Sequence, residues 1–259
     1  MSLQADKISL TIGRRAILDN VTLAARAGEV TAIVGPNGSG KTSLLRAITG
    51  EYQTAGTTHL NGLLVTQANG ARLAIMRGVL PQAARLAFPF KAIEVVRIGH
   101  QAGPHGVDRQ LPHRALAAVG LSGFEDRFYQ DLSGGEQQRV QLARVLAQVW
   151  QPVFSGQPCW LFLDEPVASL DIGHQLGIMQ LARDYAQRGG GVIAVMHDLN
   201  LTAMFAHKVA IMKNGEVFAR GDPQTVFTDT TLSAVYGCNL RINTKPSKDT
   251  PFVLPQAVI

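Results

Sequence analysis

"GPNGSGKT", residues 35–42, is the stretch that decides the fold. It satisfies the pattern G-x-x-x-x-G-K-[ST]; the apolar run "EVTAIVG" (29–35) precedes it, and a segment with apolar residues on one helical face, "GKTSLLRAITG" (40–50), follows it. In this setting the glycines let backbone N–H groups converge on phosphate oxygens, and the helix N-terminus adds its positive end. A glycine-rich turn with an exposed lysine is the less favoured alternative, because the motif is complete and correctly placed. We therefore expect a phosphate-binding loop between a strand and a helix.

Two side chains of this loop have expected roles in nucleotide binding. Lys41 is expected to reach the β- and γ-phosphates, and the hydroxyl of Thr42 is expected to ligate Mg²⁺. The predicted cofactors are ATP and Mg²⁺. The predicted nucleotide-binding residues of the loop are Gly35, Pro36, Asn37, Gly38, Ser39, Gly40, Lys41, Thr42 and Ser43.

Strand-like and helix-like segments alternate beyond the loop. The apolar runs "CWLFLDE" (159–165) and "GVIAVMHD" (191–198) lack polar alternation, which is typical of buried parallel strands. "EQQRVQLARVLAQVW" (136–150) and "HQLGIMQLARDYAQRGG" (174–190) have apolar residues at helical spacing. Such alternation predicts a parallel sheet covered by helices. The expected fold class is α/β, a P-loop NTPase (RecA-like) with a mostly parallel sheet core.

Two regions depart from this alternation. The first ~28 residues hold short β-like pieces, "KISLTI" and "VTLAA", which favour an antiparallel β flank. A mainly helical stretch interrupts the α/β pattern and predicts an inserted α-helical subdomain. We expect one nucleotide-binding domain over 1–259, and divide it into a core (1–82 and 156–240), a helical subdomain (about 83–155) and a C-terminal tail (241–259). "DTTLSAVYG" (229–237) is a candidate short helix.

Charge and composition exclude several classes of protein. The net charge of +5 is spread along the chain without a basic stripe, which disfavours nucleic-acid binding. The two cysteines form no CxxC pair, so no disulfide framework is expected and a reducing compartment fits. The N-terminus has no signal-peptide pattern, and no run approaches the ~18 apolar residues of a membrane helix. We expect a cytoplasmic protein whose membrane role, if any, comes through a partner.

The segment "WLFLDEP" (160–166) ends a predicted buried strand with two carboxylates. In open α/β folds, ligands bind at the carboxyl ends of the strands. Asp164 is therefore predicted to act as the Mg²⁺-side carboxylate, and Glu165 as the general base that orients and deprotonates the attacking water. The alternative, that both carboxylates cap the next helix, is disfavoured by the phosphate loop earlier in the chain.

The segment "LSGGEQQ" (132–138) predicts a second anion site. Ser133 with Glu136 three residues later forms a capping box, which by itself explains the serine. Gly134 and Gly135 directly after the cap leave backbone N–H groups bare at a helix start. The chain thus has two predicted phosphate-binding helix starts but only one nucleotide loop.

The ordered set "GPNGSGKT", "LPQ", "LSGGEQQ", "LFLDEP", "ASLD" and "VMHD" resembles the ATP-binding subunits of ABC transporters over roughly residues 3–240. The resemblance accounts for the surplus anion site. It implies that Ser133, Gly134 and Gly135 contact the γ-phosphate held by the other subunit of a head-to-tail homodimer, which encloses two ATP molecules.

The resemblance also implies roles for three further residues. Gln82 resembles the glutamine that contacts Mg²⁺ and the attacking water, and His197, at the end of a strand, resembles the histidine that bonds the γ-phosphate. Asp171 matches the loop that communicates across the dimer. The histidines at 100, 105, 113, 174 and 207 have no metal-ligand spacing and are interpreted as surface or structural residues. The predicted catalytic residues are Glu165, His197 and Gln82, and the predicted Mg²⁺ ligands are Thr42, Gln82 and Asp164.

One position departs from the family pattern. The family usually places an aromatic residue near the end of the first β-piece to stack on adenine, and "LTIGRRAIL" (10–18) offers Ile12 there. We expect adenine to pack against apolar and arginine side chains instead, and assign no stacking residue. Base selectivity is then expected to be relaxed.

The segments around Gln82 and before Trp160 indicate the kind of transporter. "LPQ" followed by "FPFKAIEVVRIGHQ" (88–101) resembles importers of iron chelates, haem and cobalamin. The long return loop "VWQPVFSGQPCWLFLDEPVASLDIGHQ" (149–175) resembles the haem-importing branch more closely than the siderophore or cobalamin branches. The resemblance implies an ATPase that powers haem import through two multispanning permease subunits, with a periplasmic binding protein as an indirect partner. It also implies a peripheral protein on the cytoplasmic face of the bacterial inner membrane. The alternatives are another iron-chelate or cobalamin importer, an exporter, a soluble ABC ATPase such as an iron–sulfur assembly or DNA-maintenance ATPase, and a non-catalytic nucleotide sensor.

The stretch "LPQAARLAFPF" (80–90) has apolar residues in a loop that Pro81 and Pro89 keep irregular. By the resemblance, Leu86, Phe88 and Phe90 lie where the family receives a coupling helix from its permease. An apolar contact surface is one interpretation, and packing of one or more phenylalanines inside the subdomain is the other.

Overall fold

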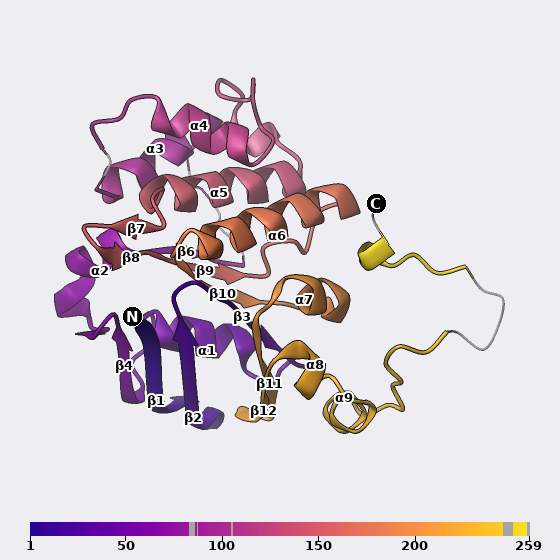
Figure 1. The fold of residues 1–259 in the computed structure, drawn as a ribbon. Helices are drawn as coiled ribbons and strands as arrows, with labels where there is room; N and C mark the ends of the chain where they lie inside the picture. The colour runs from indigo at the N-terminus through magenta and orange to yellow at the C-terminus, as the bar shows by residue number, and fades with distance from the viewer. Residues whose placement is uncertain (83–85, 87, 105, 246–250, 258–259) are drawn as a thin grey trace.

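The computed structural model of the chain describes residues 1–82, 86, 88–104, 106–245 and 251–257. Two sheets form its centre (Figure 1). The first has the strand order β2-β1-β4-β5 and contains β1 (Ser2–Ile12), β2 (Arg15–Arg26), β4 (Ala55–Leu60) and β5 (Leu63–Leu64). The second has the order β12-β11-β3-β10-β9-β6 and contains β12 (Glu216–Gly221), β11 (Lys208–Lys213), β3 (Val30–Val34), β10 (Gly191–Val195), β9 (Trp160–Asp164) and β6 (Arg77–Leu80).

Helices cover the second sheet on both faces (Figure 1). They are α1 (Lys41–Ile48), α2 (Gly70–Met76), α3 (Ala92–Ala102), α4 (Leu111–Ala118), α5 (Gly134–Gln148), α6 (Ile172–Gln187), α7 (Leu199–Phe205), α8 (Pro223–Val226) and α9 (Asp229–Tyr236). Short 3-10 turns are Gln67–Asn69, Tyr129–Asp131 and Pro255–Ala257. No helix in the part of the chain that the structure describes has the length and apolar character needed to cross a lipid bilayer.

The predicted parallel core and antiparallel flank are both confirmed. Strands β6, β9, β10, β3 and β11 are parallel, whereas β12 and the β1–β2 and β1–β4 pairs are antiparallel. Every residue of β3, β9 and β10 is buried, which explains why these segments are apolar without alternation. Strand β10 ends at Val195, so His197 lies two residues beyond the strand in which the sequence placed it.

The central sheet separates two apolar clusters. Successive side chains of β9 point to opposite faces: Trp160 and Phe162 join the cluster under α1 and the antiparallel sheet, and Leu161 and Leu163 join the cluster under α5 and α6. Because both faces of the strand are covered, neither set can be replaced by polar residues at low energetic cost.

Helices α3, α4 and α5 form a helical layer on one side of the molecule (Figure 1). Their buried residues, among them Val96, Leu116 and Leu146, belong to the same apolar cluster as one face of the central sheet. Because the helical layer and the sheet share one apolar cluster, the structure draws no boundary between them, and the subdomain at about 83–155 stays a prediction.

The loop at 80–90 divides between core and surface. Leu86 and Phe90 pack against the main apolar cluster, whereas the side chain of Phe88 is 71% exposed. The ring of Phe88 meets that of Phe90 edge to face at a centroid distance of 6.3 Å. Residues 83–85 and 87 lie outside the described residues. Packing inside the fold is thus confirmed for Phe90, whereas a contact surface at the exposed Phe88 stays a prediction.

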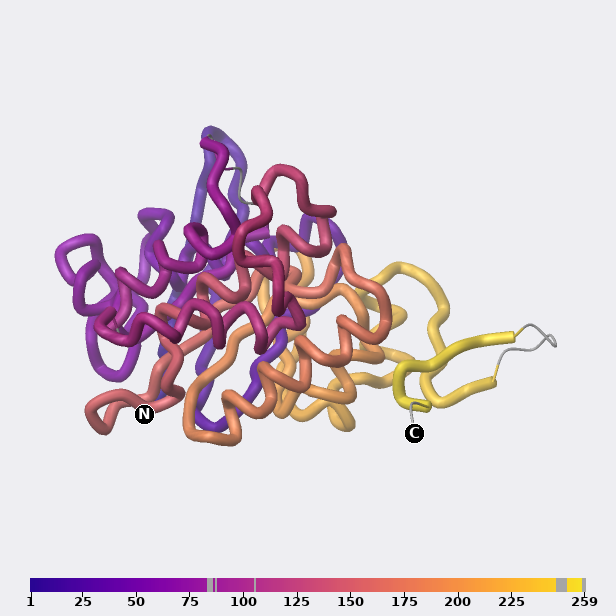
Figure 2. Tube along the Cα trace, turned by 90° about the horizontal axis from the view of Figure 1, so that it is seen from above, coloured from indigo at the N-terminus to yellow at the C-terminus, as the bar shows by residue number. Residues whose placement is uncertain are grey.

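Segments that the sequence left unassigned include β6, α2 and a short hairpin of β7 (Val153–Phe154) and β8 (Gln157–Pro158) in the return loop. The candidate helix near the C-terminus is confirmed as α9, with Thr228 at its N-cap and Gly237 in a left-handed C-cap conformation. The chain then runs away from the body and returns to α7, where Gln256 Nε2 lies 3.2 Å from Asn200 Oδ1 (Figure 2).

Candidate functional site

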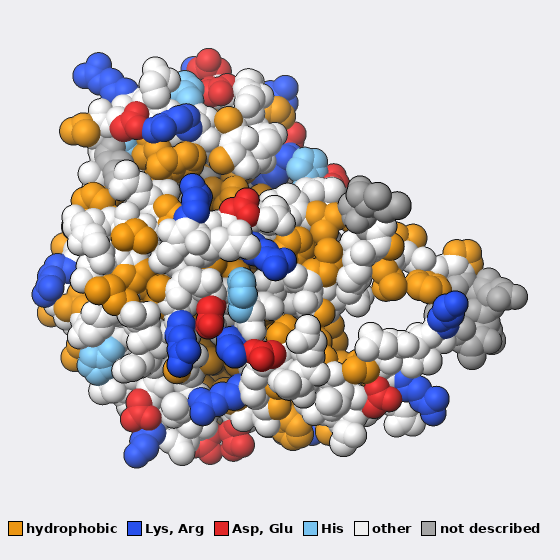
Figure 3. All heavy atoms as spheres, in the orientation of Figure 1, with side chains coloured by type: hydrophobic (Ala, Val, Ile, Leu, Met, Phe, Trp, Pro, Cys, Tyr) orange, Lys and Arg blue, Asp and Glu red, His pale blue; other side chains and the backbone are white. Residues whose placement is uncertain are grey.

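A cleft of about 570 Å³ opens at the carboxyl ends of the central parallel strands, within the usual size range of ligand sites. Basic, acidic and histidine side chains gather near the middle of this face of the molecule (Figure 3). The register explains the location, because Val195 pairs with Asp164 and also with Ile33, so the ends of β9, β10 and β3 meet. The lining residues are Arg15, Ile17, Asn37, Gly38, Gly40, Lys41, Thr42, Ser43, Gln82, Glu165 and His197.

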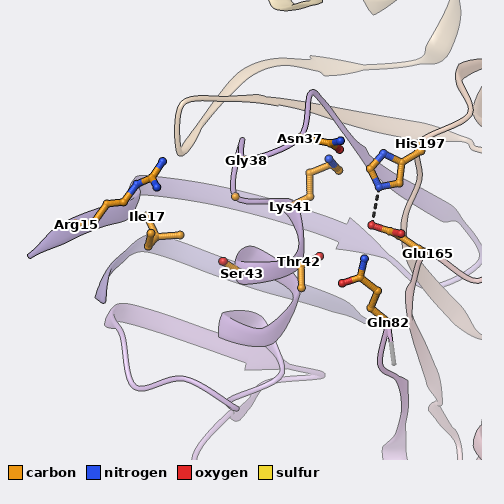
Figure 4. A pocket seen from close by; sticks show the side chains of 11 residues that line it. Arg15, Ile17, Asn37, Gly38, Lys41, Thr42, Ser43, Gln82, Glu165 and His197 are labelled. Carbon is orange, nitrogen blue, oxygen red and sulfur yellow. Dashed lines mark hydrogen bonds and ion pairs between the residues drawn. The ribbon is translucent and has the colours of Figure 1, made fainter. Parts of the chain in front are cut away.

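The predicted phosphate loop joins β3 to α1 and forms one wall of this cleft (Figure 4). Gly35 has φ +147°, and a Cβ there would lie 2.3 Å from the backbone oxygen of Met212, so only glycine fits. Lys41 Nζ donates to the backbone oxygens of Gly35 at 2.9 Å and Pro36 at 3.1 Å. Burial lowers the pKa of the Lys41 ammonium, and the carboxylates of Glu165 and Asp164 oppose that shift. The loop thus concentrates N–H donors and one ammonium at a helix start.

Thr42 and Asp164 meet at the base of the cleft. The Thr42 hydroxyl donates to Asp164 Oδ1 at 3.0 Å, although the two residues are 122 positions apart. Asp164 is buried, and this burial raises the pKa of its carboxyl, while the Thr42 hydrogen bond partly offsets the rise. A hydroxyl and a carboxylate oxygen this close are the hard oxygen donors that Mg²⁺ prefers, so the residues present fit that ion.

Glu165 points its carboxylate into the cleft toward His197 (Figure 4). His197 Nε2 lies 2.5 Å from Glu165 Oε1, and because a carboxylate accepts, this ring nitrogen carries the proton. The Glu165 backbone is in the left-handed region with φ 53°, and its N–H donates to Val195 O at 3.2 Å. The sequence predicted the two side chains separately, and the structure brings them together.

The remaining predicted residues divide into two groups. Gln82, two residues after β6, lines the same cleft close to Glu165 (Figure 4). Ser133, Gly134 and Gly135 do not reach this cleft. They line a second, separate hollow together with Glu136, Arg139, Ser169, Leu170, Asp171 and His174.

The predicted capping box at the start of α5 is confirmed, since Glu136 Oε2 accepts from the Ser133 N–H at 2.8 Å and from its hydroxyl at 2.7 Å. These bonds hold the pKa of the Glu136 carboxyl below its usual value. A Cβ on Gly135 would lie 2.9 Å from Ser169 O, so close packing against the loop before Asp171 also requires glycine. Asp171 caps α6 by accepting from His174 N at 2.9 Å.

Two lining residues were missed from the sequence. Arg15 and Ile17 form the end of the cleft opposite Glu165 and His197 (Figure 4). Ile12, the position examined for an adenine contact, is 49% exposed and is not among the lining residues. The turn at Gly13, with φ +62°, pairs Ile12 with Arg15 and starts β2, and this glycine was the signal that the chain reverses before it reaches the lining residues.

Known proteins similar to this chain are ATP-binding subunits of transporters, which agrees with the phosphate-binding cleft. A family model described as ABC transporter matches residues 18–168. Hemin import ATP-binding protein HmuV of Ruegeria sp. (strain TM1040) is 59% identical over 256 residues, covering 99% of this chain and 98% of the relative. The protein of the same name from Jannaschia sp. (strain CCS1) is 58% identical over 253 residues, covering 98% and 94%.

Among solved structures, a dimeric ATP-binding cassette in a post-hydrolysis state with bound ADP and phosphate is 25% identical. The alignment covers 85% of this chain and 98% of that one, with a TM-score of 0.74. Because the family model matches more than half of the chain and the two relatives match nearly all of it, the chain belongs to the ABC transporter family.

Proposed function

We propose that the chain is the ATP-hydrolysing subunit of a membrane importer for haem. The single observation that carries the hydrolytic activity is the meeting of the Lys41 loop, the Thr42–Asp164 pair and the Glu165–His197 pair in one cleft. The transported ligand follows from relatives at 58% and 59% identity that are hemin import ATP-binding proteins over nearly their whole length. These relatives do not favour a soluble iron–sulfur assembly ATPase or an exporter.

The residues of the cleft have distinct tasks in hydrolysis. The N–H groups of residues 35–42 and Lys41 bind the phosphates, which offsets the negative charge that builds up in the transition state. Glu165 orients a water molecule and takes its proton while the water oxygen forms a bond to the γ-phosphorus. The bond from that phosphorus to the β,γ-bridging oxygen breaks, and ADP leaves with the electron pair.

Four further side chains serve the same reaction. His197 holds the Glu165 carboxylate and is positioned to bond the γ-phosphate. Thr42, Asp164 and Gln82 are the proposed Mg²⁺ ligands. When bound, this ion neutralises charge between the β- and γ-phosphates.

The second hollow is the basis for the proposed assembly. One chain has Ser133, Gly134 and Gly135 apart from its own cleft, so a second copy placed head to tail supplies them to the γ-phosphate. Two such sites form in a homodimer with one copy of each motif per chain. We propose that two multispanning permease subunits bind this dimer at the cytoplasmic face of the inner membrane, and that a periplasmic binding protein delivers haem to them.

Closure and reopening of the dimer then gate the permease, because the two ATP-binding subunits associate with different affinity when they hold ATP and when they hold ADP. The experiment that tests the proposal measures ATP hydrolysis in proteoliposomes that contain the partner permease, with and without haem-loaded binding protein. Stimulation by the loaded protein is expected, and none by the empty protein.

The Glu165→Gln variant is the matched control for chemistry. It should bind ATP as the wild type does and hydrolyse it at least about a hundredfold more slowly, the usual contribution of a general base. Wild-type turnover in this variant would overturn the general-base assignment. Equal stimulation by a binding protein loaded with a siderophore or cobalamin would overturn the assignment of haem.

A further inference from the structure

The backbone of Glu165 is held in a conformation that a residue with a side chain rarely adopts. Its φ of 53° lies in the left-handed region, which glycine and, less readily, asparagine or aspartate adopt and which is unfavourable for a glutamate. Such conformations persist where surrounding contacts over-determine them, and they cluster at active sites. The contacts that hold this peptide are therefore part of the machinery that aims the carboxylate.

The carbonyl of Glu165 is held from two directions. Ala168 N donates to it at 3.3 Å and closes a local turn, and Gln138 Nε2 donates to it at 2.7 Å from helix α5. The orientation of the Gln138 amide is settled by chemistry, because a carbonyl oxygen can only accept and so must face the NH₂ group. The stronger of the two contacts thus comes from another element of the fold.

The opposite end of the Gln138 amide has no such contact. Its Oε1 is buried without a hydrogen-bond partner among the residues that the structure describes. A buried acceptor without a hydrogen bond lowers stability, so interactions of Oε1 do not explain why an amide occupies this position. The bond to Glu165 is the one that accounts for glutamine here.

We propose that Gln138 is a positioning residue for ATP hydrolysis, which holds the Glu165 peptide in the left-handed conformation that directs the carboxylate to His197 and the cleft. This inference rests on the proposed function, in which Glu165 is the general base. Helix α5 begins at the Ser133–Gly135 hollow, and Gln138 lies one turn further along. The geometry of the base in one cleft therefore depends on how α5, which carries the second phosphate site, is docked on the sheet.

The chain offers a matched control in the same helix. Gln148 lies at the other end of α5, is also partly buried, and also donates through Nε2 to backbone carbonyls, those of Ala74 at 2.9 Å and Arg77 at 3.1 Å. It joins α5 to α2 and to strand β6 and makes no hydrogen bond to the proposed catalytic residues. Loss of a glutamine tether in general can therefore be separated from loss of the contact with Glu165.

The experiment compares Gln138→Met and Gln148→Met, which keep the length of the side chain and remove the donor. Steady-state ATPase activity gives kcat and KM, and thermal unfolding reports folding. Gln138→Met is expected to lower kcat at least about tenfold with KM for ATP changed by less than about threefold, since sub-ångström misplacement of a catalytic group acts on the chemical step. Gln148→Met is expected to keep wild-type kcat even where it lowers the melting temperature. Should Gln138→Met fail to fold, Gln138→Leu, which also lacks a donor, is expected to show the same loss of kcat.

A double-mutant cycle with Glu165→Gln decides whether Gln138 acts through the base. Without the carboxylate, the second substitution should reduce the residual single-turnover rate by less than about twofold, because coupled residues are not additive. An unchanged kcat in Gln138→Met, or an equal loss in both backgrounds, overturns the inference. Wild-type turnover in Glu165→Gln alone would overturn the general-base assignment as well, so the two failures are distinguishable.

Discussion

His197 Nε2 lies 2.5 Å from Glu165 Oε1, and this contact joins the loops that follow two adjacent parallel strands, β10 and β9. The side chain of Glu165 is 14% exposed and that of His197 is 42% exposed, so the carboxylate is shielded and the imidazole borders solvent. The histidine therefore restrains the carboxylate from the open side of the cleft.

This restraint predicts the effect of His197→Ala. Turnover should fall about a hundredfold or more, the usual size of a positioned acid–base group, while ATP affinity changes only a few-fold because the phosphate loop is intact. Steady-state ATPase assays and titration with a fluorescent ATP analogue measure the two quantities. His113→Ala, at an exposed position on α4, is the control and should leave turnover unchanged. An equal loss in both variants would contradict a specific role for His197.

Asp164→Asn should separate stability from activity. Burial raises the pKa of Asp164 above its ordinary 3.8, so the ionised form is less favourable in the folded than in the unfolded chain. The stability contribution of this group is fully present at pH below the unfolded value and is lost as the pH rises through the folded value.

At pH 7 without nucleotide, Asp164→Asn should therefore raise the free energy of unfolding by about 1 kcal/mol, while Mg²⁺-dependent hydrolysis falls at least about a hundredfold. Thermal or urea unfolding between about pH 4 and pH 8, a range that begins near the ordinary pKa of 3.8, measures the first effect. The gain should shrink toward the acid end. A variant less stable than wild type at pH 7 would show that the favourable interactions of the ionised carboxylate outweigh the cost of its burial.

Arg15 and Ile17 predict weak recognition of the base. Substituting either by alanine should raise KM for ATP about fivefold, near the value of one cation–π or apolar contact at a partly exposed site, and leave kcat unchanged. GTP should support hydrolysis within about tenfold of ATP, because no aromatic residue in the described part of the chain lines this end of the cleft. Arg14→Ala, next to Arg15 but not among the lining residues, is the control in the same kinetic assay. A strong preference for ATP that survives both substitutions would place base recognition elsewhere.

Phe88 and Phe90 should respond in opposite ways to aspartate. Phe88→Asp should change the free energy of unfolding by less than about 0.5 kcal/mol and weaken co-purification with the permease, because its side chain is exposed. Phe90→Asp should cost about 2 kcal/mol or more, since this ring packs on the main apolar cluster and its backbone oxygen accepts from Tyr129 N at 2.8 Å. Denaturant unfolding and affinity capture of the complex measure both. Intact capture with Phe88→Asp would exclude this side chain from the permease contact.

The two cysteines should differ in reactivity. Burial raises the pKa of the Cys159 thiol to about 11, so at pH 8 only about one molecule in a thousand carries the reactive thiolate there. Cys238 is exposed. Iodoacetamide followed by mass spectrometry should find one modified thiol, Cys238, in the native protein and two after denaturation. Rapid native modification of Cys159 would contradict its burial.

Several features could be predicted from the sequence because they depend on neighbours along the chain. The phosphate loop follows from its glycines and from the apolar runs beside it, the cap of α5 from Ser133 and Glu136, and the buried strands from apolar runs without alternation. The fold class and the family follow from the order of these segments, and the comparisons confirm both.

The contacts between distant segments could not be predicted in this way. A strand that is apolar on both faces can pair with any other such strand, so the sequence does not state that β10 lies between β3 and β9 and brings His197 to Glu165. Pro89 keeps the chain irregular between Phe88 and Phe90, so no helix or strand periodicity shows which of the two rings is exposed and which is packed. Gln138 follows the capping box of Ser133 and Glu136, which accounts for the helix start without assigning a role to this glutamine. Only the docking of α5 on the sheet brings its amide to the Glu165 carbonyl.

The sequence by itself therefore determined the local parts: the loop, the helix starts and the strand ends that carry the chemistry. The tertiary structure decided which of these parts meet, because strand order and helix docking depend on burial of apolar faces between segments more than a hundred residues apart, as in the 122 positions between Thr42 and Asp164.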